Sequence, residues 1–239
     1  MDVIPAVDLM NGRVVRLVQG DPETLKSYEQ FGDPVAVAKK WEREGADAIH
    51  VVDLDAALDR GSNLGVIERI VEAVRKPVQV GGGIRSFETA QKLLQTGVKR
   101  VILGSLAFKE PETLTRLLKE FGSDRVVVAL DYRGDEVMVR GWKTATKLSL
   151  DAAVEKFLNL HVKVFLVTSI TRDGTLTGPD YETLVRVNSN PEVNVIAAGG
   201  VGRLEDLKLL KRSGVQGVVV GKALYEGVFT LKDALEVAK

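Results

Sequence analysis

Two aspartates, Asp8 and Asp131, are the residues of this chain best suited to acid/base chemistry. Each comes directly after a short apolar run, Pro5-Ala6-Val7 in one case and Val128-Ala129-Leu130 in the other. A single aspartate at the end of a strand is often only a turn former. Two in matching positions can face one substrate, where one carboxyl group donates a proton and the other accepts one. Their symmetric placement therefore favours a catalytic pair.

Glycine clusters follow four other apolar runs and predict two binding sites for phosphate. Position 83 matches position 200 and position 104 matches position 221, in both cases 117 residues further on. Glycine lets backbone N–H groups approach an anion, and a helix that begins there adds a favourable dipole. A tight turn explains any one cluster equally well, but the recurrence favours phosphate. The predicted phosphate-binding residues are Gly83, Gly104 and Ser105 in one site and Gly174, Gly200, Gly221 and Lys222 in the other.

Four further side chains stand near these motifs. Thr168 ends an apolar run, and we place it with the catalytic candidates because its hydroxyl would orient a sugar oxygen, although threonine is common in strands. Trp142, in Arg140-Gly141-Trp142, is expected either to stack on a heteroaromatic ring or to pack on the rim of the fold. Arg85 is expected to contact the substrate, with a solvated ion pair as the alternative. Asp53 either orients the substrate or forms a salt bridge with a neighbouring loop.

The elements that must position these residues alternate along the chain. Eight runs rich in valine and isoleucine predict strands that begin near Val3, Ile49, Val78, Val101, Val126, Val164, Val195 and Val218. Unbroken apolar runs are typical of parallel strands buried on both faces. Amphipathic spacing predicts helices from Pro34 to Glu44, Leu64 to Val74, Ser86 to Thr96, Pro111 to Phe121 and Leu204 to Ser213. Eight such units without a linker predict an α/β fold, the closed (β/α)₈ or TIM barrel, with the aspartates and glycine clusters at its mouth.

The repeats predict one domain, residues 1–239, made of two half-barrels at about 1–122 and 123–239. The glycine clusters repeat after 117 residues and the aspartates after 123, a difference that a few extra loop residues explain. The first, third and fourth strands then correspond to the fifth, seventh and eighth. Each half would supply one aspartate and one phosphate site, so the ligand would carry two phosphates.

The composition excludes several classes of function. Thirty-three basic side chains balance thirty-three acidic ones, so no global field favours nucleic acid or an anionic membrane. There is no cysteine, which excludes thiol chemistry and suits a reducing compartment. The first residues do not resemble a signal peptide, and His50 and His161 lack companions at metal-ligand spacing. We expect a cytoplasmic monomer that acts on a small molecule with two phosphates, without metal or cofactor, and binds neither nucleic acid nor membrane.

The motifs together resemble a family of histidine-pathway isomerases over essentially the whole chain. The resemblance lies in Ile4 to Leu9, Gly12 to Asp21, His50 to Leu54, Val80 to Arg85, Arg172 to Thr175 and Val220 to Leu224. That family converts the phosphoribosylformimino aminoimidazole carboxamide ribonucleotide aminoaldose (ProFAR) into its aminoketose (PRFAR) by an Amadori rearrangement. The resemblance implies that Asp8 is the base and Asp131 the acid. It also implies that Thr168, Trp142 and Arg16 contact the substrate.

Three other functions remain open. The cyclase subunit of imidazole glycerol phosphate synthase is a sister barrel that also has two aspartates and two phosphate sites. The stretch from Val14 to Asp21 and the pair Gly141-Trp142 resemble the isomerase, whereas Leu166 to Ile170 is closer to the cyclase. A bifunctional isomerase would also act on phosphoribosylanthranilate. A non-catalytic binder is disfavoured, because two carboxylates would repel a dianionic ligand without a chemical benefit.

Overall fold

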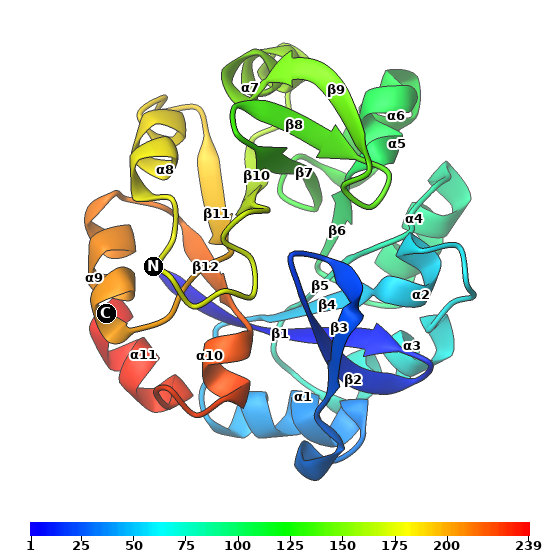
Figure 1. Cartoon of the computed structure of the whole chain (residues 1–239). Coiled ribbons are helices and arrows are strands. Elements are labelled where there is room, and N and C mark those ends of the chain that lie inside the picture. The colour runs from blue at the N-terminus through cyan, green and yellow to red at the C-terminus, as the bar shows by residue number, and fades with distance from the viewer.

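Eight parallel strands close into a barrel in the computed structural model, which describes residues 1–239 (Figure 1). In barrel order they are β1 (Asp2–Met10), β4 (Ile49–Asp53), β5 (Val78–Gly81), β6 (Arg100–Leu103), β7 (Val126–Arg133), β10 (Val164–Ser169), β11 (Asn194–Ala198) and β12 (Gly217–Val220). Each strand pairs with the next, and β12 pairs with β1, so the sheet has no free edge. The (β/α)₈ barrel predicted from the sequence is confirmed.

Helices form a ring outside the barrel (Figure 1). The longer ones are α1 (Pro34–Arg43), α3 (Leu64–Ala73), α4 (Phe87–Gln95), α6 (Pro111–Phe121), α7 (Leu150–Leu158), α8 (Tyr181–Asn188), α9 (Leu204–Arg212) and α11 (Leu231–Ala238). The short ones are η1 (Glu29–Phe31), α2 (Leu54–Ala57), α5 (Ser105–Lys109) and α10 (Lys222–Tyr225). Polar N-caps start several of them; for example, Asp33 accepts a hydrogen bond from the N–H of Ala36 at 2.8 Å.

Two apolar cores explain why the strands lack alternation between apolar and polar residues. In β1, Val3 and Val7 belong to the large core between the barrel and the helices, whereas Ile4 and Ala6 belong to a core of nine buried residues. All nine come from the barrel strands or directly before them, so this smaller core fills the barrel. Successive side chains of a strand point to opposite faces. The next residue on the inner face of β1 is Asp8, which therefore lies at the upper end of this apolar filling.

Two antiparallel hairpins continue from the first and fifth barrel strands. β2 (Arg13–Val18) and β3 (Asp21–Ser27) follow β1, and β8 (Glu136–Val139) and β9 (Thr144–Ser149) follow β7. Asp8 pairs with Val15 and Asp131 with Met138, so the two registers match. The sequence did not predict these hairpins. Because a matching hairpin follows β1 and β7, the similarity of the two halves includes these segments above the barrel mouth.

Candidate active site

Asp8 lies on the inner face of β1 and is paired with an arginine from the adjoining hairpin. Nη1 of Arg16 is 2.8 Å from Oδ2 of Asp8, and the two side chains are only 10% and 14% exposed. Burial raises the pKa of Asp8, and the positive charge of Arg16 opposes that rise. Asp8 is thus a carboxyl group whose basicity depends directly on where Arg16 lies.

Asp131 occupies the matching place on β7 but has different partners. The indole N–H of Trp142 donates a 2.8 Å hydrogen bond to Oδ2 of Asp131, and Thr168 of β10 is its register partner. Burial raises the pKa of Asp131, and the indole of Trp142 and the hydroxyl of Thr168 lower it. The structure brings together Asp131, Trp142 and Thr168, which the sequence singled out separately.

Asp173 is a third carboxylate of the mouth, and the sequence reasoning missed it. It lies in the loop between β10 and α8. Burial raises its pKa to about 6; the charge of Arg16 lowers it, while those of Asp8 and Asp131 raise it. Only the glycine of the motif Arg172-Asp173-Gly174 was used as a signal. The aspartate beside it would have been found by asking which carboxylates of the glycine-rich loops face the mouth.

The second glycine-rich site lies beside Asp173 and Arg16. A hollow of about 40 Å³ is lined by Arg16, Asp173, Gly174, Leu176, Ala198, Gly199, Gly200, Val201, Val219, Gly221 and Lys222. Gly200 has a φ of 89°, and a Cβ there would collide with the carbonyl of Gly178. The ammonium group of Lys222 donates a 2.9 Å hydrogen bond to the carbonyl of Gly174. Glycine backbone, the two cations Arg16 and Lys222, and the carboxylate Asp173 thus line this site, which we call the C-terminal cradle.

The first glycine-rich site, the N-terminal cradle, has a matching backbone. Gly104 and Gly221 have nearly equal torsion angles, with φ and ψ of −92° and −105° in one and −110° and −98° in the other. Gly83 has a φ of 66°, and a Cβ there would collide with Ala56 of α2. Ser105 begins α5, and its hydroxyl accepts a 2.8 Å hydrogen bond from the N–H of Arg140.

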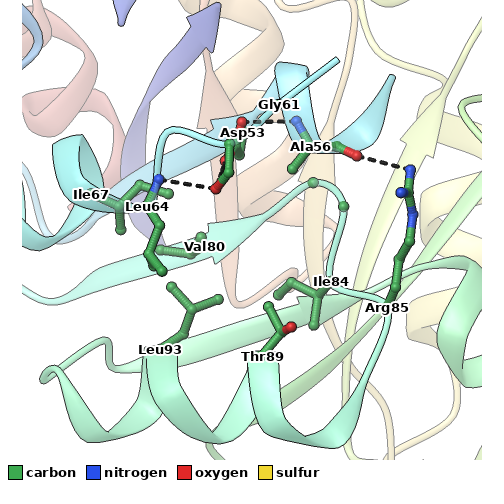
Figure 2. A pocket seen from close by; sticks show the side chains of 13 residues that line it. Asp53, Ala56, Gly61, Leu64, Ile67, Val80, Ile84, Arg85, Thr89 and Leu93 are labelled. Carbon is green, nitrogen blue, oxygen red and sulfur yellow. Dashed lines mark hydrogen bonds between the residues drawn. The ribbon is translucent and has the colours of Figure 1, made fainter. Parts of the chain in front are cut away.

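Arg85 does not contact the other candidate residues. Its guanidinium pairs with Asp59 and donates to the carbonyl of Ala56 at 2.9 Å. It borders a cavity of about 220 Å³ between α2, α3, β5 and α4, which Gly83 of the N-terminal cradle also lines and whose apolar wall includes Leu64 and Leu93 (Figure 2). In the structure Arg85 thus makes the ion pair that the sequence left as the alternative to substrate contact.

Asp53 stands at the rim of the same cavity and holds the N-terminal cradle in place (Figure 2). Its carboxylate accepts hydrogen bonds from the N–H of Ala56 at 3.0 Å and from the N–H and side-chain amide of Asn63, both at 2.7 Å. The backbone at Gly82 packs against it so closely that a Cβ would collide. The predicted salt bridge of Asp53 is wrong, because its partners are neutral groups of its own loop, and its role in orienting the substrate stays a prediction.

The hairpin after β1 closes over the mouth. The N–H of Gln19 donates to the carbonyl of Asp173 at 3.1 Å, and its amide donates to the carbonyl of Thr171 at 2.9 Å. A Cβ at Gly20 would lie 2.7 Å from the ring of Trp142. Figure 1 shows this hairpin and the loop between β10 and α8 meeting near the centre of the ring. Three loops thus shield the aspartates from bulk water.

The two histidines do not form a metal site. His50 lies inside the barrel, and its Nδ1 is 3.0 Å from the amide nitrogen of Gln79. Burial, and then the charge of Arg16, lower the pKa of His50 to about 3, so its imidazole is neutral. His161 follows α7. The structure contains no group of three or more histidine, cysteine, aspartate or glutamate side chains arranged around a metal position. None of its helices has the length and apolar character needed to cross a bilayer.

The fold and the site together define a class. The chain is a (β/α)₈ barrel whose carboxylates and glycine-rich turns gather at the carboxyl ends of the strands, where such barrels carry their active sites. The chain belongs to the histidine biosynthesis protein family, whose sequence model matches residues 2–230. This confirms the family that the motifs indicated.

Full-length relatives support the same assignment. Proteins named 1-(5-phosphoribosyl)-5-((5-phosphoribosylamino)methylideneamino)imidazole-4-carboxamide isomerase from three organisms match nearly the whole chain. That of Desulforudis audaxviator is 47% identical and covers 98% of this chain and 90% of its own. That of a Thermus thermophilus strain is 44% identical, with 98% of each chain covered. That of Methanocaldococcus jannaschii is 41% identical over the whole of both chains.

Proposed function

We propose that this protein is the isomerase of histidine biosynthesis that converts the ProFAR aminoaldose into the PRFAR aminoketose. The observation that carries the proposal is the pair of carboxylates, Asp8 and Asp131, on the first and fifth strands of an eight-stranded barrel. A ligand that spans the two cradles would place its reacting ribose between them. The relatives that carry this isomerase name over their full length support the proposal.

The two cradles would bind the two phosphates of the substrate. Backbone N–H groups at Gly83 and Gly104 would hold one phosphate, and those at Gly200 and Gly221 the other. Lys222 adds a positive charge to the second. Because the two ends are fixed, the binding free energy of the phosphates orients the ribose for reaction.

The reaction is a sequence of proton transfers, with no net gain or loss of electrons. A carboxylic acid protonates the ring oxygen of the aminoaldose, and the ribose opens to a protonated imine. A carboxylate then removes the C2′ proton, and the electrons of the C–H bond move to give an enolamine. Protonation at C1′ and loss of the C2′ hydroxyl proton give the aminoketose and return the protons taken up earlier. The net change is an isomerisation that calls for no cofactor.

Asp8 would be the base, and the acid proton would come from Asp131 and Asp173. Asp8 is held beside Arg16, which favours its ionised form. Burial raises the pKa of Asp131, although the hydrogen bond from Trp142 opposes that rise, and burial raises the pKa of Asp173 to about 6. Separate Asp131→Asn and Asp173→Asn variants test this division. We expect both variants to lose turnover. Only Asp173→Asn should also lose the change in rate near pH 6 from its pH–rate profile.

The proposed function is tested by product analysis. Purified protein in EDTA is given the aminoaldose, and the aminoketose is detected through its conversion by an independent cyclase. Ammonia plus the aminoketose tests the cyclase activity, and phosphoribosylanthranilate tests a second isomerase activity. No aminoketose formation would refute the proposal.

A further inference from the structure

Arg16 contacts the catalytic base and the C-terminal cradle with one guanidinium group. Its Nη1 is 2.8 Å from Oδ2 of Asp8. Its other edge lies against the backbone of Gly221, where a Cβ would collide with Nη2 and Cζ. Arg16 also lines the hollow formed by Gly200 and Lys222. The guanidinium of Arg16, which neutralises Asp8, therefore also lines the C-terminal cradle, the proposed phosphate site.

The guanidinium has more hydrogen-bonding capacity than Asp8 uses. Arg16 is 9% exposed, yet its Nε and Nη1 lack a well-aligned acceptor. A guanidinium presents five N–H donors in a planar fork that fits two oxygens of a phosphate. The other titratable groups around it are Asp173, Tyr28 and Tyr225. Nη1 already lies beside Asp8, whereas Nη2 faces Gly221 at the cradle and is placed to meet an oxyanion there.

The strand paired with that of Arg16, β3, is fixed beside the same cradle. Oε1 of Glu226 accepts hydrogen bonds from Lys26 at 2.7 Å and from Tyr28 at 2.6 Å. Glu226 directly follows α10, which begins at the cradle, and Lys26 is the register partner of Arg16. The backbone of Arg16 is thus held at a fixed distance from the cradle. A rotation of the side chain alone would move the guanidinium from Asp8 to the cradle.

We propose that Arg16 couples the remote phosphate of the substrate to the catalytic base: a phosphate in the C-terminal cradle draws the guanidinium from Asp8 onto its own oxygens and frees the Asp8 carboxylate to remove a proton. The proposal rests on the isomerase function inferred above. A dianion that accepts two parallel N–H bonds binds guanidinium more strongly than a carboxylate in a single contact. The small displacement needed makes the exchange local to the side chain.

The exchange gives the remote phosphate a role in rate as well as in binding. Arg16 opposes the rise in the pKa of Asp8 that burial causes, so Asp8 becomes a stronger base when the guanidinium leaves. A substrate that lacks this phosphate would meet a base still neutralised by Arg16. The loss would appear in kcat as well as in KM, because the interaction is used to reach the transition state.

A crystal structure of the wild-type protein with inorganic phosphate tests the exchange directly. We expect phosphate in the C-terminal cradle, Arg16 on two of its oxygens, and no remaining contact between Nη1 and Asp8. Phosphate bound there with the Arg16–Asp8 pair intact would overturn the exchange and leave the isomerase function standing. Lack of aminoketose formation by the same preparation would instead mark failure of the function.

A kinetic test uses inorganic phosphite as a separate dianion. The substrates are two truncated aminoaldoses, each lacking one terminal phosphate, and the variants are Arg16→Met and Arg13→Met. Arg13 is the matched control, because it begins the same strand but pairs with exposed Glu29. With the analogue that leaves the C-terminal cradle free, phosphite should raise kcat/KM at least about tenfold for the wild type and for Arg13→Met.

At saturating phosphite, Arg16→Met should show less than about a twofold response. An arginine that only binds the dianion would instead raise the phosphite concentration needed for activation and leave the activation at saturation unchanged. Activation of Arg16→Met equal to that of the wild type would refute the coupling. Should Arg16→Met fail to fold, the crystal structure of the wild type still decides the question.

Discussion

Replacement of Trp142 by phenylalanine removes one hydrogen bond from Asp131, a proposed catalytic carboxylate, and keeps an aromatic ring in the loop. The indole N–H donates to Oδ2 of Asp131 at 2.8 Å. A hydrogen bond to a charged group contributes about 1.5–3 kcal/mol. Because the bond favours the ionised carboxylate, its loss should destabilise that form by a free energy of this size and raise the pKa of Asp131.

The expected result is an upward shift of one limb of the pH–rate profile, namely the limb that disappears in Asp131→Asn. The same change alters stability with a definite sign. The pKa of Asp131 is raised in the folded state, so its ionisation opposes folding as pH rises, and the variant raises it further. The stability lost in Trp142→Phe should therefore be largest at alkaline pH and smaller below the carboxyl pKa.

Trp41→Phe is the matched control for this experiment. The indole of Trp41 is buried against Tyr225 and Lys40, and its N–H reaches no carboxylate. Its pH–rate profile should therefore keep the wild-type limbs. An unshifted limb in Trp142→Phe, or an equal shift in both variants, would refute the assignment of this hydrogen bond.

The remaining predictions concern the carboxylates and one cradle. Asp8→Asn and Asp131→Asn should each lower kcat at least about a hundredfold in steady-state assays, and mild effects in both would contradict the pair. Asp173→Asn should be more stable than the wild type at pH 8 by about 1–3 kcal/mol, because a carboxyl with a pKa of about 6 opposes folding once ionised; the difference should vanish near pH 4 in denaturant titrations. Gly200→Ala should lose at least about 1 kcal/mol through backbone strain and steric overlap and should raise KM. Gly65→Ala, in open space on α3, is the control and should unfold at the wild-type temperature or above it. Equal unfolding temperatures of Gly200→Ala and Gly65→Ala would contradict the close packing at Gly200.

The sequence predicted the barrel because its signals are local. The valine-rich runs are buried on both faces, and the glycines that recur after 117 residues have matching backbone angles, as Gly104 and Gly221 do. The hairpins gave no such signal, since every residue of β3 is exposed. An exposed strand needs no alternation of apolar and polar residues.

The parts of the site that the sequence missed depend on contacts between distant segments. Asp173 is enclosed because Gln19, far away in the chain, hydrogen-bonds to its backbone. Arg85 is captured by Asp59 on a loop that no motif marks. Arg16 was implicated only by resemblance, and its position between Asp8 and Gly221 follows from the hairpin register.

The central claim is tested most directly by one incubation. The purified protein, in EDTA and without cofactor, receives the ProFAR aminoaldose, and the product is identified by mass-matched chromatography and by its consumption in a cyclase reaction. The account predicts conversion to the PRFAR aminoketose and its loss in Asp8→Asn. An unchanged aminoaldose, or imidazole glycerol phosphate formed by the protein itself from aminoketose and ammonia, would contradict it.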